Sequence, residues 1–106
     1  SGKWYKETGS GMGTTLNIAS ELNAYTLSDR ATWITFKNKK NLEVLFHNDK
    51  KLLNQYGAIL VNPQKCPNTN TEDSKVFLDW LLSKEGQNTI KNYKVGGVQL
   101  FYPNAN

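Results

Sequence analysis

An expected helix follows the stretch Thr8-Gly9-Ser10-Gly11-Met12-Gly13-Thr14-Thr15, in which three glycines fall within five positions and hydroxyl side chains lie on both sides. Side chains recur after it at the spacing of one helical face, at Thr15, Ile18, Ala19 and Leu22. Asn23 and Ala24 mark the expected end of that helix. A helix start leaves backbone N–H groups without partners, and its dipole favours negative charge. The sequence therefore predicts a helix whose start can receive an anion.

The candidate ligand-binding residues at this helix start are neighbours in sequence: Ser10, Gly11, Met12, Gly13, Thr14 and Thr15. Glycines let an anion approach the backbone closely, and hydroxyl groups rotate to donate to its oxygens. The stretch lacks the Gly-Lys-Ser/Thr ending of a nucleotide-binding loop and the Gly-x-Gly-x-x-Gly spacing of a dinucleotide site. A small tetrahedral oxyanion therefore fits it better than a nucleotide, although a glycine-rich turn before a helix also has a purely structural interpretation.

A second candidate is Arg30, which follows Ser28 and Asp29. In one interpretation Ser28 caps a helix and Asp29 pairs with Arg30. In the other, Arg30 faces the anion, because its planar guanidinium suits paired oxygens. Both hold if Asp29 orients Arg30 toward the ligand.

The remaining pattern alternates between strands and helices, which favours an α/β fold. Short strands are expected at residues 4–5, 25–27, 42–46 and 56–61, and an extended piece at 98–102 after a turn at Gly96-Gly97. A helix is expected from about Ser28 to Phe36, another from Asn70 or Thr71, and a third capped by Ser83. The side chains expected in the core are Leu52, Leu53, Trp33, Phe77, Trp80, Ile90 and Tyr93.

The chain has 106 residues, is 38% apolar and carries a net charge of +4. These values fit one small domain with a core. A basic chain can bind nucleic acid, but no aromatic and basic residues interleave on a strand and no recognition helix is visible, so we expect no nucleic-acid partner. The positive charge also attracts small anions.

We expect no enzyme, no metal site and no resident cofactor. The chain has one cysteine, Cys66, and one histidine, His47, which are distant in sequence. One His and one Cys make no zinc site without several carboxylates, and paired carboxylates for hydrolysis are not apparent.

Several blocks of the sequence resemble the tungstate-binding proteins of ABC importers. The most specific blocks are residues 9–17 and 24–32, and the match continues in order at residues 54–57, 61–63, 77–81, 85–87 and 99–103. The resemblance implies part of a two-lobed type II periplasmic-binding-protein fold. Residues 1–63 would belong mainly to the second lobe, residues 64–106 would return toward the first, and the N-terminal lobe is not in this chain. Lys84 stands where these proteins have proline, which a helix start should tolerate.

The resemblance also implies a function. The chain would help to capture tungstate, or molybdate, and pass it to the permease of an ABC transporter, in the periplasm or on the extracellular side of the membrane. Surface that the missing lobe normally covers would let this chain associate with itself. The alternative is an intracellular domain that senses an oxyanion and regulates a partner.

Overall fold

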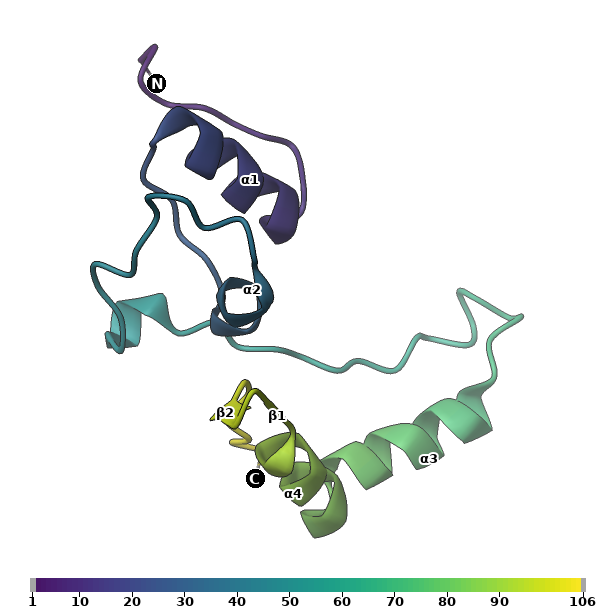
Figure 1. The fold of residues 1–106 in the computed structure, drawn as a ribbon. Helices are drawn as coiled ribbons and strands as arrows, with labels where there is room; N and C mark the ends of the chain where they lie inside the picture. The colour runs from purple at the N-terminus through teal and green to yellow at the C-terminus, as the bar shows by residue number, and fades with distance from the viewer. Residues whose placement is uncertain (1, 106) are drawn as a thin grey trace. The chain divides into compact units, whose positions relative to one another are not determined.

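The computed structural model describes residues 2–105, which fall into two units, Ser1–Asn54 and Gln55–Asn106 (Figure 1). The first unit holds α1 (Met12–Leu22), α2 (Arg30–Thr35) and the 3-10 helix η1 (Lys50–Leu52). The second holds α3 (Thr71–Leu82), α4 (Lys84–Asn92) and a hairpin of β1 (Lys94–Val95) and β2 (Val98–Gln99). The predicted assignment of residues 1–63 and 64–106 to two lobes stays a prediction.

Helix α1 ends where the sequence predicts, but it begins at Met12, within the glycine-rich stretch rather than after it. Asn23 takes the left-handed conformation, with φ of 52°, and Ala24 N–H donates to Ala19 O at 2.9 Å, which closes the last turn. The predicted buried face was partly wrong, because Leu16, which is 1% exposed, fills it, whereas Leu22 is 56% exposed. Ser20 is also buried, and its hydroxyl donates to Asn38 O at 3.0 Å.

Helix α2 lies beside α1 (Figure 1). The prediction that Ser28 caps it was wrong, because Asp29 is the N-cap and accepts from the Thr32 N–H at 3.0 Å. Trp33 is half-buried, and the Lys39 ammonium lies 4.7 Å from the centre of its ring. The predicted core role of Trp33 is therefore met only in part.

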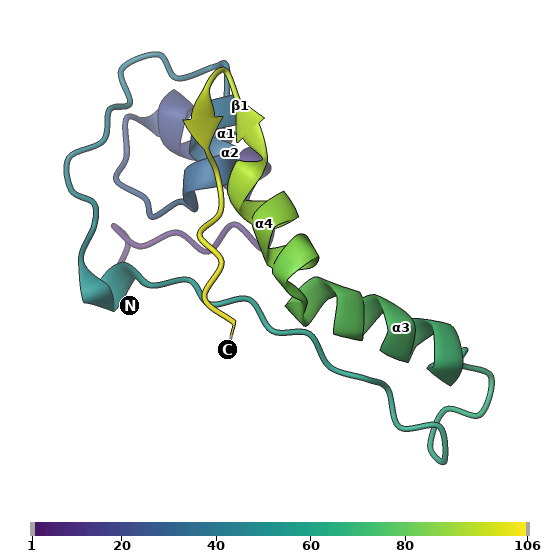
Figure 2. The same cartoon turned by 90° about the horizontal axis from the view of Figure 1, so that it is seen from below.

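Helices α3 and α4 meet at Ser83, where the chain bends (Figure 2). The Ser83 hydroxyl accepts from the Gly86 N–H at 3.1 Å, which confirms Ser83 as the cap of α4. Lys84 is the first residue of α4, a position that has no helical hydrogen bond to lose. After α4, Gly96 and Gly97 both have positive φ, 58° and 78°, as a two-residue hairpin of type I′ requires.

Four of the predicted strands were wrong. Residues 4–5, 25–27, 42–46 and 56–61 form no strand, and the two-stranded hairpin is the sheet found within residues 2–105. A strand exists only when another strand pairs with it, so a favourable side-chain pattern is not enough. The extended piece at 98–102 is a strand only at Val98–Gln99.

Most of the predicted core of the second unit is exposed. Phe77 is 62% exposed, Trp80 38% and Tyr93 56%, and the rings of Phe77 and Trp80 stack on each other at 6.2 Å. In the first unit Leu53 is 72% exposed and Leu52 39%. Among residues 2–105 the buried hydrophobic side chains are Leu16, Ala19 and Leu100. The helices present their apolar faces, as predicted, but the chain leaves much of that surface uncovered.

The N-cap of α3 offers a first prediction. Asn70 Oδ1 accepts from the Asp73 N–H at 3.1 Å, and Asn70 Nδ2 donates to Asp73 Oδ2 at 2.7 Å. Asn70→Ala removes both bonds and should lower the stability of α3 by about 1 kcal/mol. Amide hydrogen exchange across α3 measures this. Asn70→Ser keeps a capping side chain and should lower the stability of α3 less. An equal loss of stability in both variants would contradict the capping role.

Candidate anion-binding site

The start of α1 differs from the other helix starts in residues 2–105. Gly11 is its N-cap, in an extended conformation with φ of −67° and ψ of 172°, and no side chain caps the helix. The other helices of the described chain each begin with a side chain that accepts from a backbone N–H: Asp29, Asp49, Asn70 and Ser83. The first turn of α1 also holds no acidic residue. Its amides and the positive end of its dipole are thus left for another acceptor.

The space around this helix start is open. Gly11 and Thr14 are exposed, and Gly13 and Thr15 are half-buried. A Cβ added at Gly9, Gly11 or Gly13 would meet no atom within 4 Å. The glycines therefore leave room against the backbone on the outside of the helix start, as a close-fitting anion requires.

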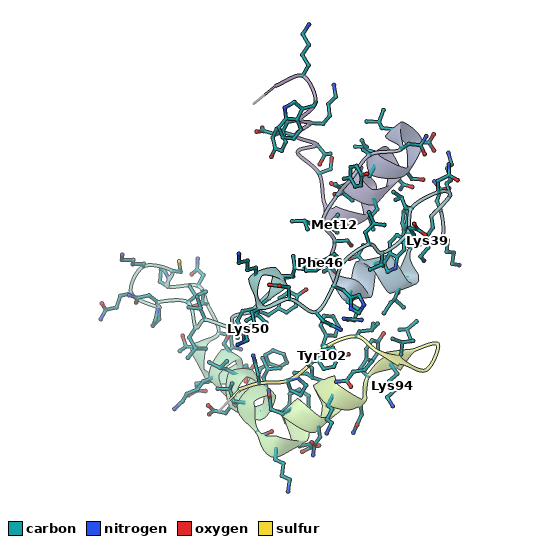
Figure 3. The ribbon with its side chains drawn as sticks, turned by 90° about the vertical axis from the view of Figure 1, so that its left-hand side faces the viewer. Met12, Lys39, Phe46, Lys50, Lys94 and Tyr102 are labelled. Atoms are coloured by element: carbon teal, nitrogen blue, oxygen red, sulfur yellow. The ribbon has the colours of Figure 1, made fainter. Side chains whose placement is uncertain are left out.

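The hydroxyl groups before and within the first turn are arranged by Thr8. Thr8 Oγ1 lies 2.8 Å from Thr15 Oγ1 and accepts from the Ser10 N–H at 3.4 Å. The Ser10 hydroxyl donates to Thr8 O at 3.1 Å. Gly9 has φ of 59°, a conformation that favours glycine, so it lets the chain turn between these hydroxyls. This gathers Thr8, Ser10 and Thr15 at the beginning of α1, where Figure 3 shows Met12.

Arg30 lies on another element. It is the first residue of α2, the helix beside α1, and its Nη2 donates to Asn48 Oδ1 at 3.1 Å. Its side chain is exposed. The fold therefore brings six of the seven predicted residues to one helix start and places Arg30 on the neighbouring helix.

Asp29 acts as a cap. Its Oδ2 accepts from both the N–H and the hydroxyl of Thr32, at 3.0 and 2.8 Å. The capping role expected for Ser28 thus falls to the next residue, while the Ser28 hydroxyl donates to Asp29 O at 2.9 Å.

Two residues near these groups were not predicted. Thr8 organises the hydroxyls and Asn48 holds Arg30. Thr8 had a signal, because it opens the glycine-rich stretch. No sequence signal pointed to Asn48. It lies 18 positions from Arg30 in a polar segment, and its φ of 63° cannot be predicted from the neighbouring residues.

Within residues 2–105, no group of three or more His, Cys, Asp and Glu side chains is placed to hold a metal ion. Across the same residues, no helix has both the length and the apolar character needed to cross a membrane.

The chain is similar to known proteins over nearly its whole length. It is 42% identical over 106 residues to the tungstate-binding protein TupA of Peptoclostridium acidaminophilum, covering 98% of this chain and 37% of that protein. It is 44% identical over 110 residues to a Haloferax volcanii protein whose provisional name describes an anion-binding protein of an ABC transporter, covering 99% and 32%. The solved structure of the tungstate-binding protein TupA from Desulfovibrio alaskensis matches with a TM-score of 0.73 and 41% identity, covering 98% and 43%.

The chain thus spans between 32% and 43% of the length of these relatives. A family model described as a PBP superfamily domain matches residues 2–85. The expected α/β class and periplasmic-binding fold agree with that family and with the solved relative. The chain therefore belongs to the PBP superfamily, which is the superfamily of the periplasmic-binding proteins.

Proposed function

We propose that this chain forms one side of a binding site for tungstate, in an extracytoplasmic solute-binding protein that serves an ABC transporter. The observation that carries the proposal is the start of α1, which is uncapped, open and surrounded by hydroxyl groups. The names of the relatives support tungstate as the oxyanion, since two of them are tungstate-binding proteins. Ligand capture of this kind needs no catalytic group.

The donors suit a tetrahedral dianion. The N–H groups of Met12, Gly13 and Thr14 precede the first helical hydrogen bond, which runs from the Thr15 N–H to Gly11 O at 3.0 Å. The Thr14 hydroxyl adds a donor that rotates toward an oxygen. The Ser10 hydroxyl would do so by leaving its hydrogen bond to Thr8, and the Thr15 hydroxyl by leaving or reversing its own. Hydrogen bonds to a charged group contribute about 1.5–3 kcal/mol each. Several such bonds together offset the desolvation of the anion.

Arg30 would supply countercharge. Its guanidinium donates a hydrogen bond to the side-chain amide of Asn48, which helps to hold the Arg30 side chain. A planar guanidinium donates two parallel hydrogen bonds to one oxyanion. In this proposal α1 provides backbone dipoles and α2 provides the full positive charge.

For transport, the protein would need a membrane partner and a location outside the cytoplasm. The partner would be the permease of an ABC transporter, and the place would be the periplasm or the outer surface of the cell membrane. The rest of the donors would come from the part of the longer relatives that this chain does not match.

The test is a calorimetric titration with tungstate, molybdate and sulfate. The protein is a chimera in which this chain replaces the matching part of the Peptoclostridium relative. We expect tungstate to bind most tightly and sulfate least. Thr14→Val should weaken tungstate binding by about tenfold because it removes one hydrogen bond to the anion, and Arg30→Ala should weaken it more because it removes two.

Thr35→Val is the matched control, since the Thr35 hydroxyl donates to Ala31 O at 3.0 Å, at the other end of α2 from Arg30. It should leave the affinity unchanged. If tungstate affinity survives both Thr14→Val and Arg30→Ala, the site assignment is wrong even though the family membership stands.

A further inference from the structure

The Thr15 hydroxyl bonds to the segment before its helix rather than to the helix itself. The hydroxyls of Thr35, Ser74 and Thr89 each donate to a carbonyl oxygen four residues earlier, at 3.0, 2.6 and 2.8 Å. That is a common bond for a threonine or serine within a helix. Within residues 2–105 the partner of the Thr15 hydroxyl is instead the hydroxyl of Thr8, seven positions earlier, with the two oxygens 2.8 Å apart. Thr8 therefore keeps this hydroxyl away from the carbonyl groups of α1.

The pair of hydroxyls lies beside the free amides of α1. Thr15 is the first residue whose N–H makes a helical hydrogen bond, so it lies one turn after the N-cap Gly11. Side chains of an α-helix tilt toward its N-terminus, so the Thr15 side chain leans over the turn that holds the amides of residues 12–14. Thr8 and Thr15 are both half-buried. Their hydroxyls are thus near the place where the proposed function puts the anion.

The direction of the bond between the two hydroxyls decides what the anion receives. Two hydroxyls at 2.8 Å share one hydrogen, so one of them donates and the other keeps a hydrogen that points elsewhere. If Thr15 donates, its only hydrogen is used on Thr8. If Thr8 donates, Thr15 Oγ1 accepts, and the hydrogen of Thr15 is free to turn toward an oxygen of the anion.

Ser10 favours Thr8 as the donor. The Ser10 N–H donates to Thr8 Oγ1 at 3.4 Å, and a hydroxyl that accepts a hydrogen bond becomes a better donor because the bonds polarise each other. The Ser10 hydroxyl also donates to Thr8 O at 3.1 Å, which holds the backbone of Thr8 in place.

We propose that Thr8 is a positioning residue for the anion: its hydroxyl donates to Thr15 Oγ1, and this turns the Thr15 hydroxyl hydrogen toward the ligand. The inference rests on the proposed function, because it concerns the same helix start. Thr8 acts only through Thr15 and does not contact the anion itself. Removing the Thr8 hydroxyl should therefore weaken binding only while the Thr15 hydroxyl is present.

A double-mutant cycle on the chimera, read by calorimetric titration with tungstate, tests this dependence. We expect Thr15→Val to weaken binding by about tenfold and Thr8→Val by about threefold, since the second variant loses only the orientation of a donor. The double variant should bind as Thr15→Val alone does, because Thr8 then has no hydroxyl to orient. Thr8→Ser keeps the hydroxyl and should restore most of the affinity.

Thr69→Val is the matched control, because it also removes a loop hydroxyl, one that donates to Cys66 O at 2.9 Å in the second unit. It should leave the affinity unchanged. If Thr8 only shapes the loop, Thr8→Val will weaken binding as much in the Thr15→Val background as in the parent, and this result overturns the proposal. A larger loss for Thr8→Val than for Thr15→Val also overturns it, since Thr8 would then be the donor next to the anion.

The variants Thr14→Val and Arg30→Ala separate this test from that of the proposed function. If they weaken tungstate binding and Thr8→Val does not, the site assignment is supported and the inference about Thr8 is wrong. If none of the variants at positions 8, 14, 15 and 30 weakens binding, the site assignment is wrong, and the role of Thr8 is overturned with it.

Discussion

Replacing Gly11 with aspartate should weaken tungstate binding by more than about 100-fold while making α1 more stable. Gly11 has φ of −67° and open space at its Cβ position, so aspartate fits without strain. Aspartate is among the best N-cap residues and would occupy the free amides itself. Its charge, about 5 Å from a dianion, adds roughly 3 kcal/mol of repulsion per unit charge at an effective dielectric constant of 20. Binding and stability should therefore change in opposite directions.

The same chimera gives both readouts, calorimetry for affinity and thermal unfolding for stability. Gly11→Asn separates the two causes, because asparagine caps the helix without adding charge. It should stabilise α1 as aspartate does and weaken tungstate binding less. If Gly11→Asp stabilises the helix and leaves the affinity unchanged, the open helix start is only structural.

Gly86→Ala should destabilise the second unit by about 3 kcal/mol. A Cβ at Gly86 would lie 2.1 Å from Trp80 O and 2.9 Å from Leu81 O, which are backbone atoms at the end of α3. No rotamer change relieves this contact, so α3 and α4 must move apart or the cap at Ser83 must break. The Gln87 side chain, which donates to Leu81 O at 2.8 Å, would be displaced as well. Urea unfolding followed by circular dichroism measures the loss.

Gly13→Ala is the control for helix propensity. Gly13 also lies within a helix, but a Cβ there meets no atom within 4 Å. Alanine should stabilise α1 by about 0.5–1 kcal/mol. If Gly86→Ala and Gly13→Ala changed the free energy of unfolding equally, close packing between α3 and α4 would not be what requires glycine at position 86.

Local signals in the sequence predicted the helices well. The end of α1 at Asn23 and the caps Asn70 and Ser83 depend on residues within five positions of the groups they satisfy. The error at α2 is of one position, because Ser28 and Asp29 both suit a cap and only the backbone decides between them. Such contacts are readable from neighbouring residues alone.

Strands and core were harder to predict, because both depend on residues distant in sequence. Residues 42–46 and 56–61 have strand patterns, yet a pattern does not show where a partner strand is. Phe77 and Trp80 lie on the apolar face of α3 as predicted, but periodicity does not show that anything covers that face.

The candidate site also has a part that local sequence predicts and a part that depends on residues distant in sequence. Six of its residues are contiguous and were predicted together, since a helix start brings its own amides to one place. Arg30 depends on how α2 lies against α1 and on Asn48, which is 18 positions away. The resemblance to tungstate-binding proteins, read from several short blocks, added what local reasoning did not supply, the kind of oxyanion.

The most direct measurement is a crystal structure of the chimera with tungstate, in which the anomalous scattering of tungsten locates the ion. The account predicts a tungsten peak at the start of α1, with oxygens within about 3 Å of the amide nitrogens of residues 12–14. A fully occupied tungsten site elsewhere, with those amides facing only solvent, would contradict it.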